Sequence, residues 1–281
     1  MMPNTDRPPS TSAHRPRKRF GQHFLTDANV IRRIVELIAP QATDHVIEIG
    51  PGPGALTEHL AEHVGQLDLI EIDRDLAAAL RERYAGSAVQ VHEMDALKLD
   101  LAAFFRPSAS SSAPRVVGNL PYNVGTEILM RLLTASHPPR DMVFLLQKEV
   151  VDRLLATPGS RTYGRLSVMA QALCEVRGGF LVKPGSFTPP PKVDSKLVAL
   201  VPHSPNERLG SGSLSALDHI VRLAFGQRRK MIGKSLRGHV SETQLQDAGI
   251  EATSRPEQIP VSTFVALASA AARRGTNLDA D

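Results

Sequence analysis

Residues 45–54 read H-V-I-E-I-G-P-G-P-G, and this stretch decides the fold of the chain. Its first half is a short apolar run of the kind that forms a buried strand, and residues 55–60 have the pattern of a helix. Glycine has no Cβ, so a ligand can reach the backbone of the turn, and a helix start offers free N–H donors. The stretch therefore predicts a strand, a glycine turn and a helix that bind a cofactor. A purely structural turn is the alternative, because dinucleotide sites usually read G-x-G-x-x-G.

Apolar segments of strand length alternate with amphipathic segments of helical length on both sides of this stretch. Such alternation indicates an α/β fold with a doubly wound, mostly parallel sheet. We expect strands at residues 45–49, 67–72, 89–92, 116–117, 142–146, 179–182 and 196–201. We expect helices at residues 27–39, 55–64, 75–84, 125–133, 148–155 and 166–174.

Four regions of different composition divide the chain. Residues 1–19 are rich in Pro, Ser, Thr and Arg, which predicts a disordered basic tail. Residues 20–202 hold the sheet, and the polar residues 203–215 have the composition of a linker. Residues 216–281 show only helical patterns, which predicts a small C-terminal α-helical domain. Its helices are expected at residues 217–225, 229–236, 242–248 and 261–272.

The composition is that of a soluble protein of the cytoplasm. The chain has 281 residues, 42% of them hydrophobic, but no run that spans a bilayer and no apolar block of the signal-peptide type near its start. We therefore expect no membrane contact. A mitochondrial transit peptide is the alternative, because Asp6 is the one acidic residue in the Arg-rich start. The single cysteine, Cys174, has apolar neighbours and is expected to be a buried, reduced thiol without a chemical role.

Basic residues gather in two places, which matters more than the net charge of +4. One group lies in residues 15–19, and the other in residues 222–237, with no Asp or Glu between residues 219 and 241. Such groups favour a polyanionic partner, although a solvated helix face explains either group alone. The expected nucleic-acid contacts in the second group are Arg222, Arg228, Arg229, Lys230 and Lys234.

Polar side chains follow successive predicted strands. Glu71 ends the second strand, 21 residues after Gly50, and a carboxylate there can accept both ribose hydroxyls of a nucleoside cofactor. Asp73 is the neighbouring candidate, and Asp95 after the third strand can accept an adenine amino group. Each carboxylate alone is more often a cap or a surface charge. In series, however, they line the crevice at the carboxyl ends of the strands, where open α/β sheets bind ligands.

The sequence N-L-P-Y, residues 119–122, follows the fourth predicted strand. An amide, a stiff turn and an aromatic face together suit an exocyclic amine on a flat base. We assign the Oδ1 of Asn119 and the backbone carbonyl of Leu120 to accept hydrogen bonds from that amine. Pro121 stiffens the turn, and Tyr122 stacks on a base that has left its own stack.

Phe187 precedes three prolines at residues 189–191. A proline run is stiff and donates no hydrogen bonds, so it typically holds an exposed loop in one shape. We therefore expect Phe187 to cover the base on the side opposite Tyr122. Ordinary core packing is the alternative for this side chain.

With these residues in view, the chain resembles the S-adenosylmethionine-dependent ribosomal RNA adenine N6,N6-dimethyltransferases. The matching segments run through most of the chain, and their order is far more specific than any one of them. They are residues 20–25 (FGQHFL), 48–57 (EIGPGPGALT), 119–122 (NLPY), 147–154, 163–166, 187–195 (FTPPPKVDS) and 225–230 (FGQRRK).

The resemblance implies a Rossmann-like methyltransferase sheet with a small helical domain, and S-adenosylmethionine as cofactor. It also implies a substrate, two adjacent adenosines in the hairpin near the 3′ end of small-subunit (16S) ribosomal RNA. The partner would be a precursor 30S particle and the enzyme a monomer. Many relatives carry Asn where this chain has His23. The implied cofactor contacts are His23, Leu25, Gly50, Glu71, Asp95 and Asn119.

Three rival functions stay open. One is a large-subunit ribosomal RNA adenine methyltransferase, and residues 187–195 and 225–230 favour the small-subunit enzyme. Another is a DNA adenine methyltransferase, which needs a base-recognition domain that we do not find. The third is a non-catalytic assembly or transcription factor, against which Glu71, Asp95 and Asn119 argue.

The chain has one pair of histidines at metal-ligand spacing. His59 and His63 are four residues apart on a predicted helix, which is compatible with a metal site. A solvated helix face is favoured, because no third ligand accompanies them. We predict no metal requirement.

Overall fold

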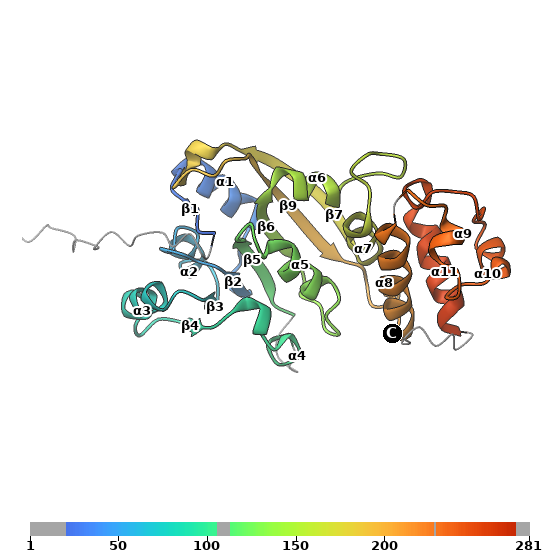
Figure 1. The fold of residues 1–281 in the computed structure, drawn as a ribbon. Coiled ribbons are helices and arrows are strands. Elements are labelled where there is room, and N and C mark those ends of the chain that lie inside the picture. The colour runs from blue at the N-terminus through green and yellow to red at the C-terminus, as the bar shows by residue number, and fades with distance from the viewer. Residues whose placement is uncertain (1–20, 106–112, 228, 274–281) are drawn as a thin grey trace, which may run out of the picture.

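The computed structural model describes residues 21–105, 113–227 and 229–273. Figure 1 shows a sheet with helices on both faces, followed at the C-terminal end by a group of helices. The predicted tail, Phe20 of the first matching segment and Arg228 of the basic group lie outside the described residues.

The main sheet has seven strands in the order β4-β3-β2-β5-β6-β9-β7. The first five of these, from β4 to β6, run parallel, whereas β9 is antiparallel to both β6 and β7. This topology confirms the predicted α/β class with a doubly wound, mostly parallel sheet. The strands are β2 (His45–Ile49), β3 (Gln66–Glu71), β4 (Val89–Glu93), β5 (Arg115–Asn119), β6 (Met142–Gln147), β7 (Cys174–Val182) and β9 (Ser195–Pro202).

Local sequence explains why these elements form. The side chain of Asp27 accepts hydrogen bonds from the N–H groups of Asn29 and Val30, which caps the first helix. Gly118 lets β5 approach β2, because a Cβ at that position would lie 2.4 Å from the carbonyl oxygen of Ile49. The helices that cover the sheet are α1 (Ala28–Ile38), α2 (Thr57–Ala61), α3 (Arg74–Arg83), α4 (Leu101–Phe104), α5 (Gly125–Leu133), α6 (Lys148–Leu154) and α7 (Arg165–Leu173). Short 3-10 turns are η2 (Ala96–Lys98), η3 (Pro184–Ser186) and η4 (Pro256–Gln258).

Two predicted boundaries differ from the structure by five residues or more. Strand β7 begins five residues earlier than expected, because its register shifts between Gly178 and Leu181 and the glycines there interrupt the apolar pattern. Helix α8 begins at Ser211, inside the segment predicted to be a linker, since small polar residues can form the exposed first turns of a helix whose later residues are buried. The C-terminal helices are α8 (Ser211–Gly226), α9 (Ile232–Ser235), α10 (Glu242–Asp247) and α11 (Val261–Arg273).

Helix α7 joins the two parts of the molecule. Leu166 belongs to the core beneath the sheet, whereas Val168 and Met169 belong to the core formed with α8 and α11. The hydroxyl of Tyr163 donates to the carbonyl oxygen of Ile259 at 2.9 Å, which ties the segment before α7 to the C-terminal helices. The helical part thus shares a core with residues that precede the end of the sheet, and the division into separate domains stays a prediction.

A second, two-stranded sheet brings distant segments together. Strand β1 (Phe24–Leu25) pairs antiparallel with β8 (Phe187–Thr188), and a cis peptide bond follows between Thr188 and Pro189. Two-residue strands are too short to leave a periodic pattern, so neither was predicted from sequence. The pairing sets residues 23–26 and 186–189 side by side.

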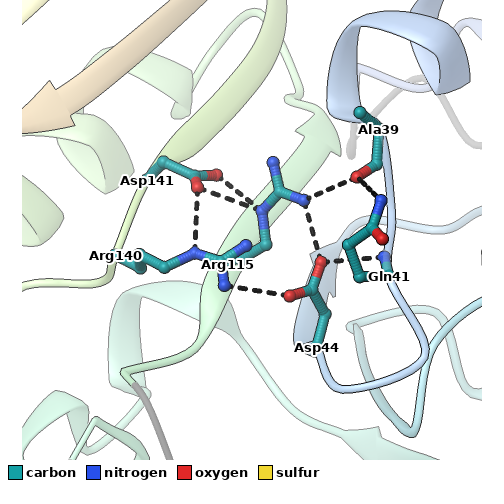
Figure 2. A network of polar contacts seen from close by, with 6 residues as sticks. All are labelled: Ala39, Gln41, Asp44, Arg115, Arg140 and Asp141. Carbon is teal, nitrogen blue, oxygen red and sulfur yellow. Dashed lines mark hydrogen bonds and ion pairs between the residues drawn. The ribbon is translucent and has the colours of Figure 1, made fainter.

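Charged residues close the amino ends of β2, β5 and β6, as Figure 2 shows. We call Asp44, Arg115, Arg140 and Asp141 the amino-end cluster. The guanidinium of Arg115 donates to Asp44 and to Asp141, each at 2.9 Å, and Nη1 of Arg140 lies 2.9 Å from Oδ1 of Asp44. Burial alone would raise the pKa of Asp44, but hydrogen bonds from Arg115 and from the N–H of Gln41 hold it below its usual value. The cluster satisfies its own charges.

Candidate active site

A pocket of about 230 Å³ lies at the carboxyl ends of β2, β3 and β5, beside residues 21–24. It is lined by eight of the residues selected from the sequence, which come from five separate segments of the chain. These are His23, Gly50, Glu71, Asp95, Asn119, Leu120, Pro121 and Tyr122. Leu25 and Phe187 are not among the residues that line it.

The glycine turn forms the floor of the pocket. Gly50 has φ +68° and Gly52 has φ +59°, a left-handed conformation that side chains disfavour. A Cβ on Gly52 would lie 2.9 Å from the ring of Phe24, so this close approach also requires glycine. The sequence signal for a tight glycine turn is therefore explained by backbone conformation and by the proximity of Phe24.

Glu71 is buried, with 4% of its surface exposed. Its two carboxylate oxygens accept hydrogen bonds from the N–H groups of Gly52, at 3.1 Å, and of Asp73, at 2.9 Å. Burial raises the pKa of Glu71, although these hydrogen bonds act in the opposite direction. The carboxylate is thus fixed by backbone donors and still has lone pairs for further donors.

A second buried acid lies behind the glycine turn. Glu48 is 2% exposed, and the hydroxyl of Thr57 donates to its Oε2 at 2.7 Å. Burial raises the pKa of Glu48 to about 7, and the nearby charge of Glu71 acts in the same direction. Sequence reasoning missed this residue, because a glutamate inside an apolar strand gives no sign of its charge state.

Asp95 and several apolar side chains form the wall beyond Glu71. The Oδ1 of Asp95 accepts from the N–H of Leu97 at 2.9 Å and caps η2. Ile72 is 43% exposed even though it is large and apolar, and it lines the pocket together with Met94. Sequence reasoning missed Ile72 and Met94. The available signal was an apolar residue directly after the acid that ends β3, where the chain leaves the sheet.

Asn119 is held in one orientation. Its Nδ2 donates to the backbone carbonyl of His23 at 2.8 Å. A carbonyl oxygen can only accept, so the amide nitrogen must face His23 and Oδ1 is the atom that remains for a ligand. The structure therefore brings the amide of Asn119 to the pocket wall in an acceptor orientation. The N–H of the next residue, Leu120, is used in the sheet, where it donates to Leu145 at 3.2 Å.

Tyr122 and His23 both line the pocket, and their rings lie side by side. Their ring centroids are 5.3 Å apart with an angle of 32° between the planes. The hydroxyl of Tyr122 lies 2.5 Å from Oγ of Ser195, and Nδ1 of His23 lies 2.8 Å from the carbonyl oxygen of Pro189. Burial raises the pKa of Tyr122, so its phenol is neutral at physiological pH.

Two expectations about side chains need correction. Phe187 is 2% exposed and packs in the core with Leu25, its partner across the β1–β8 pairing, so it is not an exposed lid in this structure. Leu25 is 5% exposed, and Phe24 lines the pocket in its place. Side chains alternate across a strand, and only the register of β1 decides which of two neighbours faces the ligand.

The predicted RNA contacts lie on the C-terminal helices. Arg222 is in α8, Arg229 and Lys230 follow that helix, and Lys234 is in α9. All four are exposed. Nη2 of Arg222 lies 3.2 Å from Nδ1 of His219. Their part in RNA binding stays a prediction.

Cys174 and the histidine pair are not at the pocket. Cys174 is buried, and burial raises the pKa of its thiol to about 12. The Nδ1 of His63 lies 2.7 Å from the carbonyl oxygen of His59, one turn earlier in the chain. In the described ranges, His, Cys, Asp and Glu form no group of three or more that could hold a metal ion. Across those same ranges, no helix combines the length and apolar composition of a membrane span.

The chain matches a known family over most of its length. A family model described as ribosomal RNA adenine dimethylase matches residues 13–273. A Nitrosococcus oceani protein named ribosomal RNA small subunit methyltransferase A is 49% identical over 260 residues, which cover 92% of this chain and 97% of that protein. A protein of the same name from Pseudomonas fluorescens is 48% identical over 256 residues, with 91% and 93% covered.

Solved structures share the fold. The structure of a dimethyladenosine transferase from Plasmodium falciparum superposes with a TM-score of 0.74 at 23% identity, covering 90% of this chain and 99% of that one. The structure of the 23S rRNA methyltransferase ErmE gives a TM-score of 0.66 at 28% identity, with 88% and 98% covered. Both solved structures therefore align with this chain over nearly its whole length.

Proposed function

This chain belongs to the ribosomal RNA adenine dimethylase family, and from that premise we propose that it methylates N6 of two adjacent adenosines in the 3′-terminal hairpin of small-subunit (16S) ribosomal RNA. Its methyl donor in this proposal is S-adenosylmethionine. The observation that carries the proposal is the amide of Asn119, whose Oδ1 is left to accept a hydrogen bond at the pocket wall.

The described residues fit a nucleoside cofactor. The exposed side chain of Ile72 offers an apolar surface for an adenine ring, next to the buried carboxylate of Glu71. In this proposal Glu71 binds the ribose hydroxyls, Asp95 the adenine amino group, and Gly50 leaves the backbone accessible. His23 and the backbone of Leu25 complete the binding residues. When bound, S-adenosylmethionine supplies a methyl group on a sulfonium, which leaves as a neutral thioether.

The residues around Asn119 act on the nucleophile. The lone pair of an adenine N6 is delocalised into the ring, and acceptors at its two N–H groups favour a pyramidal, more nucleophilic nitrogen. Asn119 Oδ1 and the Leu120 carbonyl take this part, and Pro121, the next residue, keeps the turn stiff. Each transfer forms one bond from N6 to carbon, breaks one carbon–sulfur bond and releases one N6 proton to water. Positioning supplies most of the catalysis, so no acid or base is assigned.

In this proposal the RNA partner is small-subunit ribosomal RNA. The relatives named small subunit methyltransferase A are 45–49% identical to this chain, compared with 28% for the 23S rRNA methyltransferase. A non-catalytic role is not favoured, because Glu71, Asp95 and Asn119 all line one pocket. We propose a precursor 30S particle as substrate, a role in small-subunit biogenesis, a monomeric state and a cytoplasmic location.

The decisive test is methylation of purified, unmethylated small subunits with labelled S-adenosylmethionine, followed by mapping of the modified nucleotides. Two adjacent dimethyladenosines near the 3′ end are expected. Bound cofactor without any dimethyladenosine would favour the non-catalytic alternative. In a parallel assay with large subunits, label in those subunits alone would favour a large-subunit ribosomal RNA substrate.

RNA affinity tests the basic residues separately. Phosphate contacts release counterions, so affinity should fall steeply with salt. Replacing Arg228 and Arg229 by glutamate is expected to weaken binding of the small-subunit particle that carries the hairpin. It should also flatten the dependence of affinity on salt. The matched control is Arg74→Glu, an exposed arginine on α3. Unchanged affinity and salt slope in the double variant would place the RNA elsewhere.

A further inference from the structure

The segment FTPPPKVDS, residues 187–195, contacts Tyr122 and the neighbouring His23, two residues that line the pocket. Its last residue, Ser195, has no exposed surface, and its Oγ lies 2.5 Å from the hydroxyl of Tyr122. Its Pro189 carbonyl lies 2.8 Å from Nδ1 of His23, whose ring packs against Tyr122. One segment thus fixes both the far end of the Tyr122 ring and the ring beside it.

These contacts form a closed path back to the amide of Asn119. Asn119 donates to the backbone of His23, the His23 ring lies against Tyr122, and Tyr122 is bonded to Ser195. Tyr122 is half-buried and Ser195 fully buried, so the ring cannot swing away about χ1 without breaking the bond to Ser195. Ser195 therefore determines where the ring lies relative to the Asn119 acceptor.

We propose that Ser195 is a positioning residue that determines the extent of methylation, by fixing Tyr122 as the platform on which the target adenine lies. The inference rests on the proposed function and deepens it. Ser195 does not touch the base, but acts through the Tyr122 hydroxyl.

The two methyl transfers depend on this platform to different degrees. Unmethylated N6 has two N–H donors, one for Asn119 and one for the Leu120 carbonyl. The first transfer releases one of these protons, so the monomethylated amine is held by a single hydrogen bond. The second transfer must then rely more on stacking for the position of the base. A loosened Tyr122 ring slows the second transfer more than the first.

The test is Ser195→Ala, with Ser167→Ala as the matched control. Ser167 is also fully buried, and its Oγ donates to the Arg153 carbonyl at 2.5 Å, away from the pocket in α7. We expect Ser195→Ala to slow the second transfer about 3- to 10-fold, the effect of one hydrogen bond, so that N6-monomethyladenosine accumulates. The first transfer and cofactor affinity should change less than about twofold. Ser167→Ala should lose similar stability and keep the parental product ratio.

Tyr122→Phe and the double variant keep the inference falsifiable if Ser195→Ala folds poorly. Both partners of the hydrogen bond are absent from the double variant, so its product ratio should match that of either single variant rather than their combined effect. The chain has three tyrosines, Tyr84, Tyr122 and Tyr163, so ring signals of ¹³C-labelled tyrosine can be assigned. Ser195→Ala should shift only the Tyr122 signal.

Two outcomes separate this inference from the function on which it rests. If the parent chain makes no methyladenosine, the proposed function fails and the inference fails with it. If the parent makes dimethyladenosine and Ser195→Ala gives the same ratio of monomethyl to dimethyl product, the inference alone is overturned. An unchanged Tyr122 ring signal in Ser195→Ala would overturn it as well.

Discussion

The two ends of the parallel sheet treat buried acids in opposite ways. At the amino ends, Asp44 is matched by two guanidinium groups, which hold its pKa low (Figure 2). At the carboxyl ends, Glu71 is held by backbone N–H groups, and among the described residues no side-chain cation is bonded to it. Its pKa is raised by burial. A buried carboxylate thus has its charge neutralised within the protein at the amino end. At the carboxyl end it keeps lone pairs that can accept hydrogen bonds from a ligand.

The difference separates stability from binding. A buried carboxylate with internal cations is a closed arrangement, and its loss affects folding. A buried carboxylate without them destabilises the free protein slightly and offers its charge to an external donor. Replacing charges at the two ends should therefore affect different measurements, which the following experiments check.

The largest effect is expected from Arg115→Met in the amino-end cluster. Methionine keeps the apolar stem but leaves Asp44 and Asp141 without their shared, 8% exposed arginine. Removing one partner of a buried ion pair costs about 3–5 kcal/mol of unfolding free energy. Arg140→Met is the control, because that side chain is 41% exposed, solvent screens its charge, and the cost should stay below about 1 kcal/mol. Urea unfolding measures both, and equal losses would contradict the internal role of Arg115.

Asn119→Ala tests the carboxyl end next. Loss of the Oδ1 acceptor should lower the rate of methyl transfer about 10²- to 10³-fold or more, an effect comparable to that of removing a preorganised hydrogen-bond group elsewhere. Cofactor binding should weaken only modestly and stability should change little. Single-turnover methylation and calorimetric cofactor binding measure the two quantities. Asn29→Ala on α1 is the matched control, and full activity in Asn119→Ala would refute the assignment.

Glu71→Gln should affect binding rather than folding. Loss of the charge-assisted hydrogen bonds to the ribose is expected to weaken S-adenosylmethionine binding about 10- to 100-fold. Glu93→Gln is the control, because Glu93 is the register partner of Glu71 on β4 and does not line the pocket. Unfolding should change by no more than about 1 kcal/mol in either variant. A large loss of stability in Glu71→Gln with unchanged cofactor affinity would make that end of the sheet structural too.

The smallest effect concerns pH and Glu48. The folded chain keeps the Glu48 proton up to a pKa of about 7, whereas the unfolded chain releases it near 4.5. The folded state therefore holds more protons between these values, and the unfolding free energy falls as pH rises through that window. Glu48→Gln does not titrate, so it should match the parent near pH 5 and exceed its stability above pH 7 by on the order of 2 kcal/mol. Urea unfolding across pH measures this.

Glu62→Gln is the control for the pH experiment. Glu62 is an exposed acid directly after α2, so Glu62→Gln makes the same substitution where the side chain is not buried. A Glu48→Gln variant that gains no stability above pH 7 would mean that the buried carboxylate at this end has a charge partner after all.

Sequence predicted the parts of the pocket better than their roles. Gly50, Glu71, Asp95 and Asn119 were identified because each lies at or just after the end of a strand, and the carboxyl ends of parallel strands meet at one edge. Phe187 was misjudged, because a proline run shows that a loop is stiff without showing which way its aromatic residue points.

Ser195 and Ile72 were missed for a related reason. A serine at the end of a motif and an isoleucine after an acid have ordinary local patterns. Their significance lies in what approaches them from other segments, Tyr122 for Ser195 and the pocket for Ile72. Such contacts join residues far apart in the chain, so local periodicity does not predict them.

By itself, the sequence determined the α/β class, the order of strands and helices along the chain, and the acids at the strand ends. These depend on apolar periodicity, glycine and proline, which act over a few residues. Only the tertiary structure decided which acids are neutralised, which way the Asn119 amide faces and what holds Tyr122. Charge state and orientation depend on burial and on partners from distant segments, and these exist only once the chain has folded.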